Sequence, residues 1–216
     1  MKYSHKQNMK LIIFDFDGTI ADTSEGILDA HRFVLNTMGR EVPSEEELRG
    51  VIGANLLTTY IEKFGFSDLD ARVAVRVYRE RYAEVGIHKA ILYPGFVDVI
   101  KNLKNKGYKI GVATLKVEDF AKSMLNEMEI VDYFDAICGM DSNDSFNKAG
   151  LILKCCDLCG CEKRETTLVG DSKNDFIGAQ QAQVDFIGVT YGFGFKPEEK
   201  YEFKTVENCN DLIWIF

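Results

Sequence analysis

The sequence lacks long apolar runs and a recognisable export signal. Its 216 residues contain no apolar stretch near the roughly 18 residues that a membrane-spanning helix requires. The polar residues 1–10 precede a short apolar run, too short for the hydrophobic part of a signal peptide. We therefore expect a cytoplasmic protein that has no membrane partner.

Positive charge is scarce, because 26 lysines and arginines face 34 aspartates and glutamates, leaving a formal net charge of -8. Non-specific nucleic-acid binding needs a basic surface, so the composition argues against a nucleic-acid partner. A small anionic substrate stays possible, since the local field at a site outweighs the net charge. The sequence leaves the oligomeric state open, and a monomer is compatible with it.

Clusters of cysteine and histidine with the paired spacing of a zinc site are also lacking. Four of the six cysteines do fall close together: Cys155, Cys156, Cys159 and Cys161. Whether they bind a metal is open, but the histidines are too scattered to complete such a site. We favour the alternative that Cys155, Cys156 and Cys159 lie on or near a helix as small hydrophobic side chains.

What is present is an alternation of short apolar runs and helical patterns. Apolar runs that predict buried strands occupy residues 11–14, 109–114, 134–139, 166–170 and 186–190. Amphipathic segments between them predict crossover helices, and a last short helix is expected at residues 210–216, with Trp214 against the sheet. This order is typical of an α/β protein with a doubly wound, Rossmann-like parallel sheet.

Residues 23–88 differ, because helical spacing dominates and no strand-like run occurs. Ser44, with Glu47 three residues on, predicts a helix that begins with a capping box. We expect a helical cap domain at residues 21–90. It would be inserted into a core domain of residues 1–20 and 91–216.

Polar side chains gather where the predicted strands end. They are Asp15 and Asp17 after the first run, Thr114 at the end of the second, Lys148 at the start of the helix after the third, and Asp171 and Asp175 after the fourth. Because parallel strands end on one edge of a sheet, we expect these groups to converge. Gly18 permits a tight turn close to a ligand.

Such a cluster suits phosphoryl transfer assisted by Mg²⁺. Carboxylate oxygens are the hard ligands that Mg²⁺ prefers, and without a metal the acids would repel one another. Mg²⁺ and Lys148 would neutralise a phosphate ester, so that a carboxylate can attack phosphorus. Each group also has a structural alternative: the acids can cap helices or turns, and most lysines are solvated. Their ordered occurrence at strand ends favours function.

These motifs together resemble the haloacid dehalogenase-like hydrolase superfamily. Its four signature motifs match Asp-Phe-Asp-Gly-Thr at residues 15–19, Thr114, Lys148, and Gly-Asp-x-x-x-Asp at residues 170–175. Residues 170–179 and 188–194 resemble the phosphoglycolate-phosphatase-like branch, which carries a helical cap. The resemblance implies that Asp15 is the nucleophile and that Asp17 protonates the leaving alcohol and later activates water.

The same resemblance implies the ligands. Mg²⁺ would be held by Asp15, Asp171 and the backbone carbonyl of Asp17. The phosphoryl group would be held by Thr114 and Lys148. Independently of the resemblance, we expect the free N–H groups around Gly18 to form a small anion-binding nest. Asp175 would support metal-bound waters or orient Lys148.

Two departures from the family pattern concern the pocket. Leu115 stands where many relatives have a small polar residue, and the arginine often found before Lys148 is missing. In the cap, Arg49 opens a glycine-containing loop and would contact an anionic substrate, unless it is only a surface arginine at a turn. Residues 20–23 and 87–93 would be the hinges of this lid.

We expect a Mg²⁺-dependent phosphatase for a small phosphorylated metabolite, and the resemblance suggests phosphoglycolate first. Alternatives in the superfamily are a 5′-nucleotidase, a pyrophosphatase and a sugar-phosphate mutase. A phospho-accepting regulatory module would also use an aspartate, a threonine and a lysine around Mg²⁺. It would not need Asp17 or the cap, and it would keep its phosphoryl group.

Overall fold

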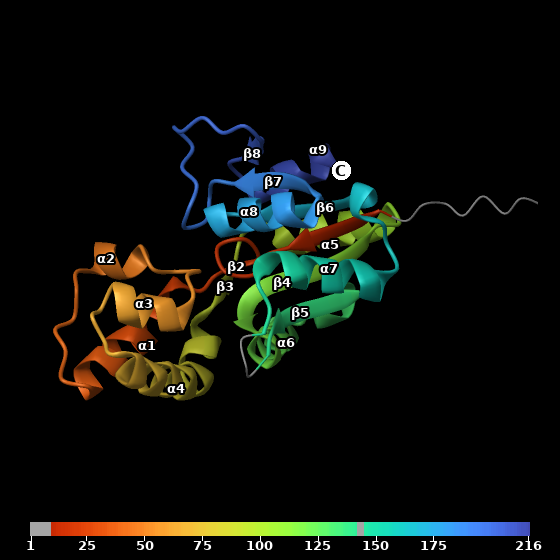
Figure 1. The fold of residues 1–216 in the computed structure, drawn as a ribbon. Helices are drawn as coiled ribbons and strands as arrows, with labels where there is room; N and C mark the ends of the chain where they lie inside the picture. Colours follow the sequence, from red (N-terminus) through yellow and green to blue (C-terminus); the bar gives the residue numbers. More distant parts are fainter. Residues whose placement is uncertain (1–9, 142–144) are drawn as a thin grey trace, which may run out of the picture.

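The computed structural model describes residues 10–141 and 145–216, which form an α/β core and a helical cap (Figure 1). The cap, drawn in orange to yellow, lies to one side of the core. Residues 1–9 of the predicted core lie outside the described residues. No helix in the described ranges is both long and apolar enough to cross a membrane.

Within those ranges, six strands form one parallel sheet in the order β5-β4-β1-β6-β7-β8. They are β1 (Leu11–Phe14), β4 (Lys109–Val117), β5 (Ala136–Met140), β6 (Thr166–Gly170), β7 (Asp185–Val189) and β8 (Lys204–Val206). The central strand β1 pairs with β4 on one side and with β6 on the other. The predicted doubly wound, Rossmann-like parallel sheet is confirmed.

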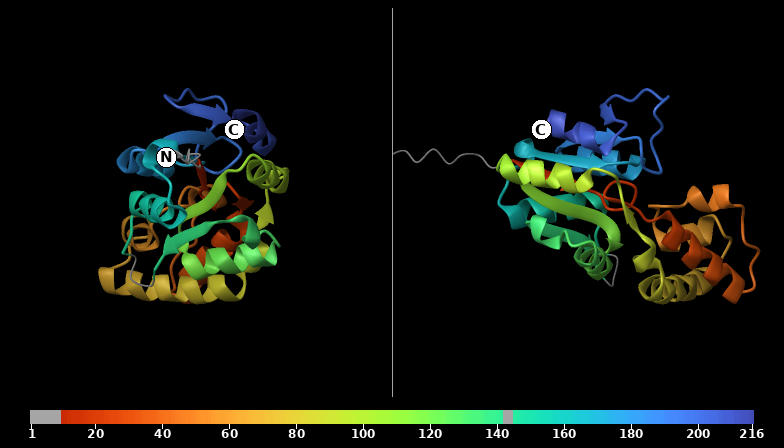
Figure 2. Two further views of the ribbon diagram at one scale, coloured as in Figure 1. Left: turned by 90° about the vertical axis from the view of Figure 1, so that its right-hand side faces the viewer. Right: turned by 180° about the vertical axis from the view of Figure 1, so that it is seen from behind.

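Helices cover both faces of the sheet, because alternate residues of β1 point to opposite sides. Ile12 and Phe14 join one buried cluster, whereas Leu11 and Ile13 join another. The first cluster contains side chains of α5 (Phe96–Asn105), α6 (Glu118–Glu127) and α9 (Leu212–Ile215), and the second those of α7 (Lys148–Cys159) and α8 (Lys173–Ala182). Figure 2 shows these two groups on opposite sides. The central strand β1 is therefore buried, and the predicted site lies at the ends of the central strands.

The cap is helical, as predicted. It contains α1 (Ser24–Thr37), α2 (Glu45–Arg49), α3 (Leu56–Glu62), α4 (Asp68–Glu84) and the short 3₁₀ turn Gly86–Lys89. Ser44 and Glu47 form the predicted capping box at the start of α2. The buried faces of the helices meet around the aromatic side chains of Tyr60, Tyr78 and Tyr82.

The two linkers between cap and core form a short antiparallel ribbon. Strand β2 (Ala21–Asp22) pairs with β3 (Ile91–Leu92), and the amide of Tyr93 donates to the carbonyl of Ile20 at 3.1 Å. The ribbon lies in both segments that we predict to be hinges. Its hydrogen bonds hold the start and the end of the cap together.

Several details differ from the sequence prediction. The strands β2, β3 and β8 were not expected, and β4 continues to Val117 rather than stopping at Thr114. Trp214 does not pack against the sheet: its side chain is 86% exposed, so that prediction is wrong. Helix α9 is a single turn, and Leu212 supplies its buried contact instead.

The cysteines behave as small hydrophobic residues. Cys155, Cys156 and Cys159 lie on α7 and are buried in the cluster behind β1 and β4. Cys161 is half-buried just after the helix. The packing of these thiols therefore supports the preferred alternative, because their side chains complete the core beneath α7.

Candidate active site

The loop after β1 carries the two predicted acids. The amide of Asp15 still pairs with the carbonyl of Val169 on β6 at 2.9 Å, which fixes the strand end. The chain then turns at Gly18, whose φ of +79° favours glycine. A Cβ at this position would overlap the carboxylate of Asp171, so glycine also permits the loop to approach that acid.

Lys148 lies between two buried carboxylates. Its Nζ is 2.6 Å from Asp15 Oδ1 and 2.6 Å from Asp175 Oδ1, and it donates to the carbonyl of Ala113 at 2.8 Å. Burial alone would lower the pKa of Lys148, but the fields of Asp15 and Asp175 raise it above its ordinary value. The lysine is therefore a fixed cation at the floor of the site.

Asp171 follows β6 and faces Asp15 from the neighbouring strand end. Its Oδ2 accepts hydrogen bonds from the amides of Phe193 (2.6 Å) and Gly194 (3.3 Å). Asp175 lies one helical turn further on, in α8. Its Oδ2 accepts from the amide and hydroxyl of Ser172 in a capping box, while its Oδ1 contacts Lys148. Asp175 thus both caps α8 and orients the lysine.

The acids form a group suited to a metal ion. One oxygen each of Asp15, Asp171 and Asp175 lies within 4.8 Å of the others, and all three side chains are buried. Burial raises the pKa of Asp15 to about 7, although Lys148 opposes this shift. Burial, together with the charges of Asp175 and Asp15, raises the pKa of Asp171 well above its usual value. One lysine does not compensate three buried acids, so a divalent cation fits this donor set.

Thr114 and Arg49 line the same pocket from opposite sides. Thr114 is buried at the end of the predicted strand segment, in a pocket that also contains Asp15, Lys148 and Asp171. Arg49 comes from the cap, and its guanidinium is 3.0 Å from Glu45 Oε1, with the side chain half exposed. Asn174 also joins core and cap, since its Nδ2 donates to the carbonyl of Gly53 at 3.3 Å.

The structure adds partners of Asp17 that we did not predict. Asp17 Oδ1 accepts a hydrogen bond from Thr23 Oγ1 at 2.6 Å and lies 3.1 Å from Lys116 Nζ. Lys116 also donates to the hydroxyl of Tyr82, on cap helix α4, at 2.7 Å. A lysine two residues after Thr114 is visible in the sequence. Its direction depends on a register shift between β4 and β5, which no local pattern reveals.

A second pocket adjoins the first at Asp17. Its walls come from both cap and core and are largely apolar or aromatic, with Lys116 and Arg79 as cations. His31, Tyr78, Tyr82 and Phe120 are its aromatic side chains. Leu115 lines both pockets. A leaving group that takes a proton from Asp17 would therefore meet aromatic rather than acidic surfaces.

Known proteins resemble this chain in sequence and in fold. The sequence profile of haloacid dehalogenase-like hydrolases matches residues 12–189. The chain is 32% identical over 202 residues to a 5′-nucleotidase of Pseudomonas aeruginosa, covering 93% of this chain and 91% of that protein. It is 30% identical over 215 residues to phosphoglycolate phosphatase 1 of the same species, covering 94% and 78%. The crystal structure of a predicted phosphatase from Clostridium acetobutylicum matches with a TM-score of 0.89 and 29% identity, covering 96% of this chain and 97% of that one.

Fold, site and relatives together define a phosphatase, a phosphoric monoester hydrolase with an α/β core and a helical cap. The chain belongs to the haloacid dehalogenase-like hydrolase family, and to its phosphoglycolate-phosphatase-like branch. The resemblance inferred from the sequence is thus confirmed at the level of the family and branch.

Proposed function

We propose that this protein is a Mg²⁺-dependent phosphatase that hydrolyses a small phosphorylated metabolite through an aspartyl-phosphate on Asp15. The observation that supports this most is the buried contact of Asp15 with Lys148, beside Asp171: the two acids follow strands β1 and β6, and the lysine begins helix α7. Metal-binding acids, a fixed cation and a nucleophile are the groups that phosphoryl transfer requires. We also propose residues 21–90 as the cap domain and residues 1–20 and 91–216 as the core domain.

In the first step, an oxygen of Asp15 would attack phosphorus. The bond from phosphorus to the ester oxygen would break, its electron pair staying on that oxygen, which takes a proton from Asp17. Lys148, Thr114 and the turn at Gly18 would hold the phosphoryl oxygens in line.

In the second step, Asp17 would accept a proton from water as the water oxygen attacks the phosphorus, which releases phosphate and restores Asp15. Bound Mg²⁺ would withdraw charge from the phosphoryl group. Its ligands would be Asp15, Asp171 and the backbone carbonyl of Asp17. Asp175 would keep Lys148 in place.

The substrate is a separate proposal. Phosphoglycolate is the first candidate, because the chain falls in the phosphoglycolate-phosphatase-like branch. A 5′-nucleotide is the second, favoured by the likeness to a 5′-nucleotidase and by the aromatic pocket beside Asp17. Arg49 would contact an anionic part of either one. The alternatives in function are a pyrophosphatase, a sugar-phosphate mutase and a regulatory module. The cytoplasmic location and the absence of nucleic-acid or membrane partners stay predictions.

The test is a panel of phosphorylated metabolites, including phosphoglycolate and 5′-nucleotides, assayed with Mg²⁺ and with EDTA. We expect repeated turnover with Mg²⁺, loss of activity in EDTA, and preference for one of the two candidate substrates. A single phosphorylation of the protein, with release of one alcohol and no turnover of phosphate, would instead favour the regulatory module. Transfer of the phosphoryl group back to a sugar would favour a mutase.

A further inference from the structure

Lys116 has a buried side chain and is not among the groups that take part in the two proposed steps. It lies beyond Thr114 on β4, where the pairing with β5 shifts its register, and its side chain is only 6% exposed. Buried lysines are rare unless a partner compensates the charge. Here the partner is Asp17, whose Oδ1 is 3.1 Å from the ammonium group.

The partners of Asp17 meet at one of its two oxygens. Among the described residues, both Thr23 Oγ1, at 2.6 Å, and Lys116 Nζ, at 3.1 Å, contact Oδ1. A carboxyl group held in this way leaves its other oxygen, Oδ2, for a substrate in the pockets that Asp17 lines. A proton transferred to or from substrate would therefore move through Oδ2, in an orientation fixed by the two donors.

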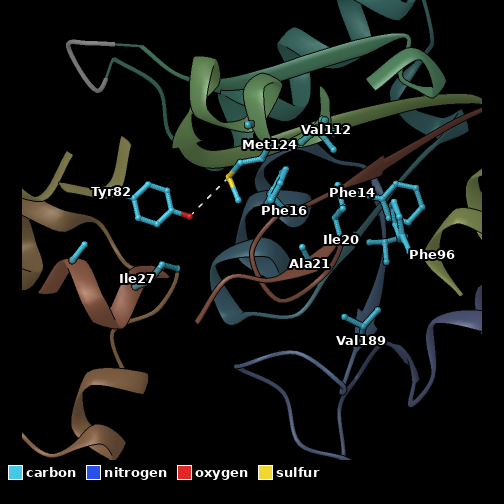
Figure 3. Close-up of a cluster of buried hydrophobic side chains, with 14 of the residues drawn as sticks. Phe14, Phe16, Ile20, Ala21, Ile27, Tyr82, Phe96, Val112, Met124 and Val189 are labelled. Carbon is cyan, nitrogen blue, oxygen red and sulfur yellow. Dashed lines mark hydrogen bonds between the residues drawn. The ribbon is translucent and has the colours of Figure 1, made fainter. Parts of the chain in front are cut away.

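Lys116 in turn is held by the cap. Its Nζ donates to Tyr82 on α4 at 2.7 Å and lies 4.3 Å from the centre of that ring. The hydroxyl of Tyr82 also reaches the sulfur of Met124 on core helix α6, at 3.9 Å, as Figure 3 shows. The ring stacks on Tyr78 of the same cap helix. Tyr82 thus joins the cap to the cation that contacts Asp17.

We propose that Lys116 is a positioning residue that aligns Asp17 for proton transfer, and that Tyr82 makes this alignment depend on the docked cap. The inference rests on the proposed function, because it assumes that Asp17 gives its proton to the leaving oxygen as the phosphorus–oxygen bond breaks. Lys116 itself neither loses a proton nor touches phosphorus.

Leaving groups of different basicity test this role. An alkyl phosphate expels a basic alkoxide and needs the proton, whereas 4-nitrophenyl phosphate expels a stable anion and does not. Single-turnover rates of alcohol or nitrophenol release report the first step alone. Because general acid catalysis typically contributes about 100- to 10,000-fold, we expect Lys116→Met to slow the alkyl ester about 10-fold more than the nitrophenyl ester.

Two further variants separate positioning from other effects. Tyr82→Phe removes one oxygen and should show the same selectivity to a smaller degree, mainly in kcat rather than KM. In an Asp17→Asn background, Lys116→Met should cause little further loss, since residues that act as a unit are not additive. If Lys116 acted on the substrate directly, the losses would multiply. The matched control is Lys122→Met, an exposed lysine of α6, which should leave both rates unchanged.

Equal slowing of both esters by Lys116→Met, or no slowing, would overturn the proposal. If Lys116→Met did not fold, the test would use Tyr82→Phe. A Tyr82→Phe variant that slowed both esters by the same factor, relative to the unchanged enzyme, would overturn the proposal as well. Failure of the proposed function gives a different result, because the unchanged protein would then show no repeated turnover of either ester.

Discussion

At the scale of single residues, the charge of Lys148 offsets part of the charge of the buried acids. Its ammonium contacts Asp15 and Asp175 at 2.6 Å each, and all three side chains are buried. Removing one member of a buried charge cluster leaves the others uncompensated, which is far more costly than losing a surface ion pair. Lys148 therefore contributes to folding as well as to the reaction we propose.

We predict that Lys148→Met lowers kcat by at least about 100-fold, because a phosphoryl clamp is lost. In EDTA it should also lower the free energy of unfolding by about 3 kcal/mol, and Mg²⁺ should recover part of this loss. Steady-state kinetics and urea unfolding measure both effects. Lys154→Met, on the same helix, is the control and should change neither by much. Near-normal turnover of Lys148→Met would remove it from the phosphate clamp.

The sequence predicts those side chains whose position follows from the order of strands and helices. Asp15 and Asp171 converge because parallel strands finish on one edge, and Lys148 joins them from the start of the helix after β5. This rule needs no knowledge of packing. The neighbours of Asp17 could not be found in this way. Lys116 depends on a shift in strand register, and Tyr82 on how the cap docks against the core.

At the scale of elements, helix α1 places a histidine in the middle of the cap. His31 is 1% exposed, and it packs against the rings of Tyr60, Phe64 and Tyr78. Its Nδ1 lies 3.2 Å from the hydroxyl of Tyr60. Burial lowers the pKa of His31 from 6.5 to about 4, because the apolar surroundings disfavour the imidazolium.

This shift predicts a cap that weakens in acid. The unfolded chain takes up a proton near pH 6.5 and the folded chain only near pH 4, so lowering the pH through this window favours unfolding. We expect His31 to account for about 3 kcal/mol of lost stability across the window. Urea unfolding at several pH values should show a smaller loss for His31→Gln than for the unchanged protein. Parallel pH curves would contradict the prediction.

Elements were predictable where an apolar run is bounded by turn residues. Strands β1 and β6 have the expected limits, Leu11–Phe14 and Thr166–Gly170. Strands β2 and β3 of the ribbon are only two residues long, which is too short to show an alternation of apolar and polar residues. The expectation for Trp214 failed because α9 is one turn long and buries Leu212 instead.

At the scale of the whole molecule, the site forms where cap and core meet. The core supplies the acids and Lys148, while the cap supplies Arg49, Gly53 and most of the aromatic pocket walls. The sequence predicts both parts, since each has its own periodicity. Their relative placement depends on contacts such as that of Asn174 with Gly53, which link segments far apart in the chain.

A metal should stabilise the entire fold if the acidic cluster binds it. Mg²⁺ that binds only the folded protein raises its stability by mass action, by about 2.7 kcal/mol at 100 times Kd. For a chain of this size we expect the melting temperature to rise by about 5 to 10 °C. Asp171→Asn should abolish the rise in a thermal melt. The same rise in this variant would show that Mg²⁺ binds elsewhere.

The most direct test of the account is whether a phosphoryl group passes through Asp15. Enzyme mixed with excess substrate is quenched in acid within the first turnover, digested and analysed by mass spectrometry. The account predicts a burst of alcohol ahead of phosphate, with a phosphoryl group on the peptide that contains Asp15 and none in Asp15→Asn. Release of alcohol and phosphate at the same rate with no phosphorylated peptide, or a phosphoryl group on another residue, would contradict it.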